Sequence, residues 1–138
     1  MASVLDAISL WRLASVRMNP PASAGAVERL QELLPHGIPQ DLTTFLAAAN
    51  GMKDYEMDRD HLSMWSAERI VRERDVATAP DGDWLAIGDF LIYSYCLRVC
   101  CSAATEQVRV DGTAEPFPSL GAFLARHIAE PHGPRGVE

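Results

Sequence analysis

Hydrophobic residues recur every three or four positions in five segments, which is the spacing of one buried helix face. These segments cover about 3–18, 23–34, 39–49, 66–73 and 119–129. In the third segment Pro39 suits the first helical turn, and Asn50-Gly51 suits a left-handed cap at the end. Ser66 and Ser119 are suitable N-caps for the last two segments. We therefore expect five helices.

Alternating or continuous apolar residues predict four short strands between and after the helices. These are Leu62–Trp65, Trp84–Ile87, about Leu91–Cys101 and Gln107–Val110, with Gly88-Asp89 as a strand-ending turn. The grouping of strands between helices predicts an α+β fold with a mainly antiparallel sheet. The expected core contains Leu42, Phe45, Leu46, Trp65, Ile70, Ile87, Leu97, Val99, Val108, Phe123 and Leu124.

The length of 138 residues predicts one domain. Within it, residues 1–21 form a helical N-terminal extension, closed by two prolines, and residues 131–138 form a frayed tail. The polar and acidic stretch from Lys53 to His61 has neither helical nor strand periodicity, so we expect a solvated loop there.

Several of these features together resemble the SUKH superfamily. They are the helix ending in Asn50-Gly51, the segment Leu62–Trp65 followed by a helix start, the Ile87-Gly88-Asp89 turn and the final Phe-Leu helix. The resemblance extends from about Ala24 to Ile128. It implies a small α+β protein, and many members are bacterial immunity proteins that bind and silence a toxin. Other members regulate fungal cell-wall assembly.

The formal net charge is −7, from 12 Lys and Arg against 19 Asp and Glu. This charge repels nucleic acid and anionic membranes, so neither is an expected partner, and it attracts a basic protein surface. Many acidic proteins carry such a charge for solubility alone. No apolar run is long enough to span a bilayer and the first residues do not resemble a signal peptide, so we expect a cytoplasmic protein.

The three cysteines, Cys96, Cys100 and Cys101, lie in one expected strand and at its end. Their odd number and lack of framework spacing favour a reducing compartment and unpaired, buried thiols. Along an extended strand Cys96 and Cys100 would have Cα atoms about 13 Å apart, too far for a disulfide.

No familiar catalytic or metal-binding motif is present. The cysteines lack Cys-x-x-Cys spacing, and the four histidines form no His-x-x-x-His pair. A calcium loop counted from Asp54 would place Arg59 and Trp65 where Gly and Glu are needed. We therefore expect no metal, no cofactor and no catalytic residues. The remaining enzymatic alternative is a small hydrolase assembled from distant residues such as Asp89 and His127.

Acidic residues alternate in the expected loop, at Asp54, Glu56, Asp58 and Asp60. They form either a solvated loop or a landing surface for a basic partner. In both cases we expect exposed charges, so reversing Asp58 and Asp60 to Lys should cost little folding stability.

Aromatic residues beside acidic ones are the second candidate binding feature, because interfaces favour aromatic anchors with a polar rim. We expect Trp11, Trp65 and Trp84 in the core. The other aromatic residues, which we expect near the surface, are Tyr55, Phe90, Tyr93 and Tyr95. The predicted partner-binding set is Asp54, Tyr55, Glu56, Asp58, Asp60, Asp83, Asp89, Tyr93 and Tyr95.

Two functional hypotheses follow from the resemblance and the charge. The first is a non-enzymatic immunity protein that neutralises a basic toxin domain, for example a nuclease, by occluding it. The second keeps the fold but makes the protein a regulatory or scaffold subunit without a toxin partner.

Overall fold

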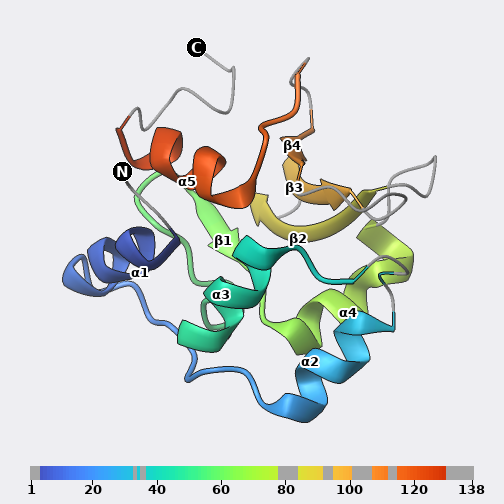
Figure 1. The fold of residues 1–138 in the computed structure, drawn as a ribbon. Coiled ribbons are helices and arrows are strands. Elements are labelled where there is room, and N and C mark those ends of the chain that lie inside the picture. The colour runs from blue at the N-terminus through green and yellow to red at the C-terminus, as the bar shows by residue number, and fades with distance from the viewer. Residues whose placement is uncertain are drawn as a thin grey trace.

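The structure, a computed structural model, confirms an α+β fold, with five helices and one antiparallel sheet in the part of the chain that it describes (Figure 1). It describes residues 4–32, 34, 37–77, 84–91, 95–100, 107–111 and 115–129, with residues 74–77 described as backbone. The elements are α1 (Val4–Leu13), α2 (Ala24–Gln31), α3 (Gln40–Ala48), β1 (Leu62–Met64), α4 (Ala67–Ala77), β2 (Trp84–Phe90), β3 (Tyr95–Cys100), β4 (Val108–Val110) and α5 (Leu120–Ala129). The expected tail at 131–138 lies outside the described residues.

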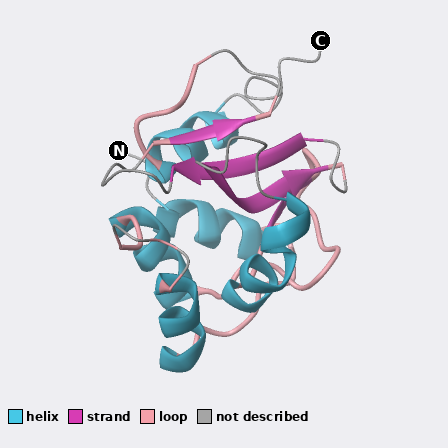
Figure 2. Ribbon diagram, turned by 90° about the vertical axis from the view of Figure 1, so that its right-hand side faces the viewer, coloured by secondary structure: helices cyan, strands magenta, loops and turns pink. Residues whose placement is uncertain are grey.

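The four strands pair in chain order, β1-β2-β3-β4, and every pairing is antiparallel. Figure 2 shows the sheet as one layer with most of the helices on one side of it. All eleven core residues expected from the sequence are buried, each at most 2% exposed. The helical and strand periodicities therefore identified the residues that face the core.

The N-terminal helix is part of the domain rather than a separate extension. Val4, Ala7, Ile8 and Trp11 of α1 are buried, and the helix packs on α3 and α5. The ring of Trp11 meets the ring of Phe45 edge to face at 6.4 Å. In Figure 1 α1 lies beside α5, although the two helices are at opposite ends of the chain.

Serine caps begin three helices. The hydroxyl oxygens of Ser23, Ser66 and Ser119 accept hydrogen bonds from the amides of Ala26, Arg69 and Ala122. Each cap provides an acceptor for one of the four amides that have no partner within the first helical turn. The predicted caps at Ser66 and Ser119 are thus confirmed.

The end of α3 differs from the expected left-handed Asn-Gly cap. Ala49 is already extended, and only Gly51 adopts positive φ (+72°). A Cβ on Gly51 would lie 2.5 Å from the backbone of Trp65, so glycine is required there. The side chain of Asn50 instead caps α4, because its Oδ1 accepts from the amide of Ala67.

The expected turn at Gly88-Asp89 lies inside β2, which continues to Phe90. A register shift between Ala86 and Gly88 accommodates an extra residue against β3. The chain turns only at Leu91, which has positive φ (+55°). The predicted turn was wrong because Gly and Asp also occur at strand irregularities, where local sequence does not distinguish them from turns.

Trp84 is half-buried rather than in the core, and the guanidinium of Arg109 lies 4.7 Å from the centre of its ring. Phe90, expected near the surface, is fully buried against Phe123 of α5.

In the described part of the chain, no helix is both long and apolar enough to cross a membrane.

Candidate functional site

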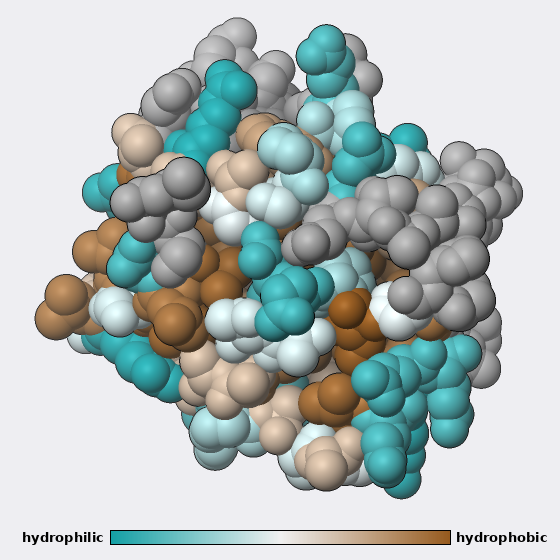
Figure 3. All heavy atoms as spheres, in the orientation of Figure 1, coloured by the Kyte–Doolittle hydropathy of each residue, from teal (hydrophilic) through white to brown (hydrophobic). Residues whose placement is uncertain are grey.

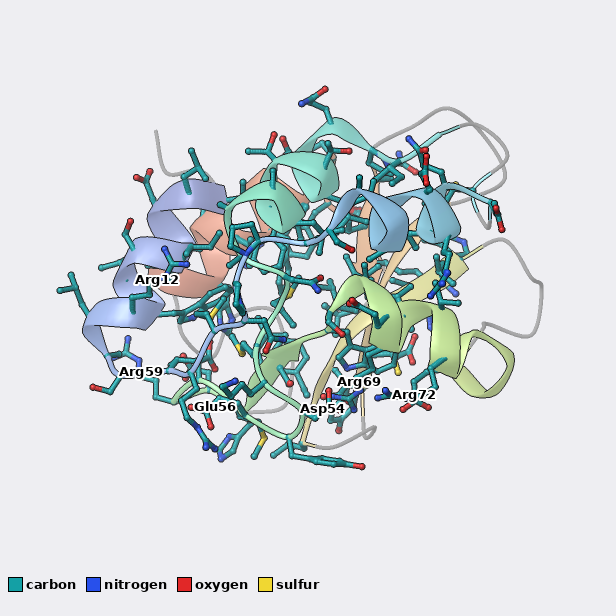
Figure 4. The ribbon with its side chains drawn as sticks, turned by 90° about the horizontal axis from the view of Figure 1, so that it is seen from below. Arg12, Asp54, Glu56, Arg59, Arg69 and Arg72 are labelled. Carbon is teal, nitrogen blue, oxygen red and sulfur yellow. The ribbon has the colours of Figure 1, made fainter. Side chains whose placement is uncertain are left out.

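The two acids at the start of the acidic segment are paired with arginines at the surface. Asp54 lies 3.2 Å from the guanidinium of Arg72, and Glu56 binds both the amide and the guanidinium of Arg17. Figure 4 shows Asp54 beside Arg72, and Glu56 nearer α1. The amide of Arg17, followed by its guanidinium, lowers the pKa of Glu56. These charges are therefore balanced within the protein.

Asp58 and Asp60 are buried, at 8% and 5% exposure, so the expectation of a solvated loop is wrong at these positions. Asp58 accepts four hydrogen bonds. Its Oδ1 accepts from the amides of Asp60 (2.9 Å) and Leu62 (3.0 Å). Its Oδ2 accepts from the indole of Trp11 (3.0 Å) and lies 2.7 Å from Nε2 of His127. The carboxylate thus joins α1, α5 and the loop before β1.

The electrostatic environment of Asp58 follows from these contacts. Burial raises the pKa of its carboxyl group, but His127 and the backbone amides of Leu62 and Asp60 together lower it by more. The pKa of Asp58 therefore lies below its ordinary value. Because the lowered pKa keeps Asp58 ionised near neutral pH, its carboxylate can only accept, and the 2.7 Å contact is a hydrogen bond donated by Nε2 of His127.

His127 is enclosed by aromatic rings. Its ring stacks on Phe123 with centroids 5.7 Å apart, and it meets the ring of Phe90 edge to face with centroids 5.8 Å apart. Among the described residues, Nδ1 is buried and has no hydrogen-bond partner. Hence the imidazole has an acidic partner on one side and apolar surroundings on the other.

A pocket of about 550 Å³ opens beside this network. It lies between the end of α1, the loop 56–60 and the end of α5, and its apolar lining includes Leu10, Trp11, Met57 and Ile128. Its volume lies within the range of small-ligand pockets. The alternating acids Glu56, Asp58 and Asp60 all contribute to its lining, together with Arg59.

Three of the side chains at this pocket carry atoms that could bind a metal ion. One oxygen each of Asp58 and Asp60 and a ring nitrogen of His127 lie within 4.8 Å of one another. Yet all four lone-pair directions of Asp58 are already occupied by N–H donors. A metal ion would have to displace those donors, so the group fits a hydrogen-bonded network better than a metal site.

A nucleophilic triad would need a hydroxyl bonded to the free nitrogen of His127. Ser15 lines the same pocket and has strained backbone geometry (φ +65°), but no hydrogen bond joins it to His127. The hydrolase alternative paired His127 with Asp89. No hydrogen bond or ion pair joins these two residues, because His127 binds Asp58 and Asp89 binds other groups.

Asp89 is the centre of a second buried polar cluster, and it is only 1% exposed. Its carboxylate accepts from the indole of Trp65 (3.2 Å) and lies 3.5 Å from the guanidinium of Arg69. Arg69 is 3% exposed and also ion-pairs with Glu73. Its guanidinium lies against the rings of Trp65 (4.7 Å) and Tyr55 (5.4 Å).

The structure brings only part of the predicted partner-binding set to the surface. Tyr55 is 67% exposed, Asp54 and Glu56 are accessible, and Tyr95 is half-buried at the start of β3. Asp58, Asp60 and Asp89 are buried. Asp83 and Tyr93 lie outside the described residues.

Two of the three cysteines, Cys96 and Cys100, are buried, whereas Cys101 lies outside the described residues. Burial raises the pKa of Cys96 to about 11. Such a thiol is not a nucleophile near neutral pH.

The outer face of α1 carries exposed leucines that the sequence prediction did not single out. Leu5, Leu10 and Leu13 are 49%, 46% and 83% exposed. Figure 3 shows hydrophobic atoms gathered over this helix at the left of the molecule. Leu10 also lines the pocket. The signal was available, because α1 has leucines outside its Val4, Ile8 and Trp11 stripe.

Comparison with known proteins adds no assignment to this geometry: no protein-family model matches the chain, and no curated protein matches it either.

Proposed function

We propose that this protein is a binding module that acts by covering part of a partner protein, without catalysis. The observation that carries the proposal is the exposure of Leu10 and Leu13 beside an open pocket. Contiguous apolar surface on a soluble protein marks an interaction site more often than chance exposure does.

The polar groups near this surface support a binding role. Asp58 is hydrogen-bonded to His127, and Glu56 is paired with Arg17. Among the described residues, Nδ1 of His127 has no hydrogen-bond partner, so no hydroxyl or thiol is bonded to this base in the way that nucleophilic catalysis requires. The buried network therefore shapes the surface rather than presenting reactive atoms.

The resemblance to the SUKH superfamily makes the proposal more specific. In that case the protein is a bacterial immunity protein of the cytoplasm, and its partner is a basic toxin domain such as a nuclease. The net charge of −7 supports a basic partner, because opposite charge accelerates encounter and disfavours wrong partners.

Co-expression with the product of the adjacent gene tests the proposal. If that product is a toxin, this chain should restore growth and co-purify with it as a complex. A variant with Leu10→Ala and Leu13→Ala should lose both effects, whereas Glu28→Gln on the exposed side of α2 should lose neither. Failure to bind or protect, with a correctly folded protein, would overturn the immunity role.

The alternative role is a regulatory or scaffold subunit of the same fold. It predicts a stable complex through the same leucines but no rescue of growth. The same experiment separates the two roles, since complex formation and protection are measured independently.

A further inference from the structure

We infer that the pocket beside α1 receives a lysine or arginine side chain of the partner, while a neighbouring apolar residue of the partner covers Leu10 and Leu13. The inference rests on the proposed binding function and adds to it the chemistry of the contact. It also revises the role of the acidic segment, whose inner residues line a pocket rather than an exposed loop.

The shape of the pocket suits a long side chain with a polar end. Apolar atoms of Leu10, Met57 and Ile128 line it, and carboxylates lie in the loop that closes it. Lysine and arginine have aliphatic stems that pack on apolar surface while the charged group stays near polar atoms. Asp58 and Glu56 already have partners within the protein, so these carboxylates favour a bound cation through their negative charge.

The charge of the lining favours a cation. Glu56, Asp58 and Asp60 carry three negative charges, against one positive charge on Arg59. Arg17 lies outside the lining and balances Glu56, so the inner acids determine the remaining charge. Glu56, Asp58 and Asp60 together with Arg59 and Arg17 carry one net negative charge.

Arg59 is a weakly held counter-ion. Its side chain is 77% exposed, and its Nε lies 3.6 Å from Asp60, beyond the usual hydrogen-bond distance. A partner cation that entered the pocket would be repelled by Arg59. Removing this positive charge should therefore strengthen binding of a basic partner and weaken binding of an acidic one, so its effect reveals the sign of the partner's charge.

A small probe tests the pocket without any partner. We would titrate the protein with n-butylguanidinium, which has an aliphatic stem and the head group of arginine, and follow the indole N–H signal of Trp11 and the amides of Leu10 and Met57 by NMR. We expect saturable shifts with a dissociation constant of about 1–10 mM. The Arg59→Gln variant should bind about threefold more tightly.

Pentanoate is the control of opposite charge, and the amide of Gly25 in α2 is the control signal. Shifts caused by pentanoate but not by n-butylguanidinium would overturn the inference, as would no shift with either probe. A third titration, with Zn²⁺ alone, tests the metal alternative. Saturation of His127 signals at micromolar Zn²⁺ would reassign the pocket to a metal ion.

The second arm uses the partner identified by co-expression. We expect Arg59→Gln to speed association about threefold at low salt, and the Leu10→Ala, Leu13→Ala double variant to weaken affinity at least about tenfold. Slower association of Arg59→Gln would overturn the cation assignment and indicate an acidic partner. Unchanged affinity in the leucine variant would place the interface elsewhere.

The two arms separate failure of the inference from failure of the proposed function. If n-butylguanidinium binds but the adjacent gene product does not associate, the pocket chemistry stands and the immunity role fails. If a complex forms while the probe and both sets of variants have no effect, the binding function stands and the pocket assignment fails.

Discussion

Two buried aspartates organise the protein in similar ways but with different partners. Asp58 and Asp89 each accept a hydrogen bond from a tryptophan indole, Trp11 and Trp65 respectively. Asp58 is then paired with His127, whereas Asp89 is paired with Arg69. A histidine can be neutral when buried, but an arginine keeps its charge. The stability of the Asp89 cluster therefore depends on keeping both Asp89 and Arg69. The Asp58 cluster should tolerate the loss of its partner His127 better.

The largest effect should come from removing the permanent charge. Arg69→Met removes this cation from the buried carboxylate of Asp89, and should destabilise the protein by about 3–5 kcal/mol. His127→Phe should cost less, about 1–3 kcal/mol, because Asp58 keeps three N–H donors. Urea unfolding of both variants measures the difference. Equal losses in the free energy of unfolding would contradict the difference proposed between the two clusters.

Asp58→Asn should cost less than Arg69→Met, with a loss of about 2–3 kcal/mol. An asparagine offers one oxygen where the carboxylate offers two, so two of the four donors lose their acceptor. Asp54→Asn is the matched surface control and should cost under about 1 kcal/mol. The sequence predicted that Asp58 and Asp60 would tolerate charge reversal. Because both residues are buried, we now expect the Asp58→Lys and Asp60→Lys variants to fold poorly. A stable Asp58→Asn variant would contradict the network.

The pH dependence of stability isolates the charge on Asp58. Its pKa in the folded state lies below the ordinary value of about 3.9, so the unfolded chain binds more protons between the two values. This contribution is fully present above about pH 4 and is lost as the pH falls through the folded pKa. Unfolding measured between pH 7 and 3 should show a smaller acid-induced loss in Asp58→Asn. A parallel pH profile would contradict this assignment.

The smallest effect should come from the indole hydrogen bonds alone. Trp11→Phe and Trp65→Phe remove one N–H donor each and keep most of the aromatic packing. Each variant should lose about 1–2 kcal/mol, including the missing ring atoms. Thermal unfolding measures both losses. A far larger loss in one variant would show that the ring, not the N–H group, carries the stability there.

The sequence predicted the parts of the fold that depend on local periodicity. The faces of α3 and α5 and the caps at Ser66 and Ser119 follow from residues within one or two helical turns. These signals do not need knowledge of distant contacts, which explains why all eleven residues of the expected core list are buried, although Trp84, also expected in the core, is half-buried.

The candidate site could not be predicted in the same way. Asp58 looks like any solvated loop acid, because its side-chain partners Trp11 and His127 are 47 and 69 residues away in the chain. Likewise, Arg69 sits at a helix position typical of exposed residues, and its burial depends on the rings of Tyr55 and Trp65. Long-range polar contacts leave no period in the sequence.

The long separations at Asp58 also bear on the order of folding. The network closes only after both α1 and α5 have docked, so its contacts form late and should be weak in the folding transition state. Variants of Trp11 and His127 should then unfold faster while folding at nearly the unaltered rate. The carboxylate of Asp58 would thus mainly slow unfolding. It would lengthen the lifetime of the native state after α1 and α5 have docked.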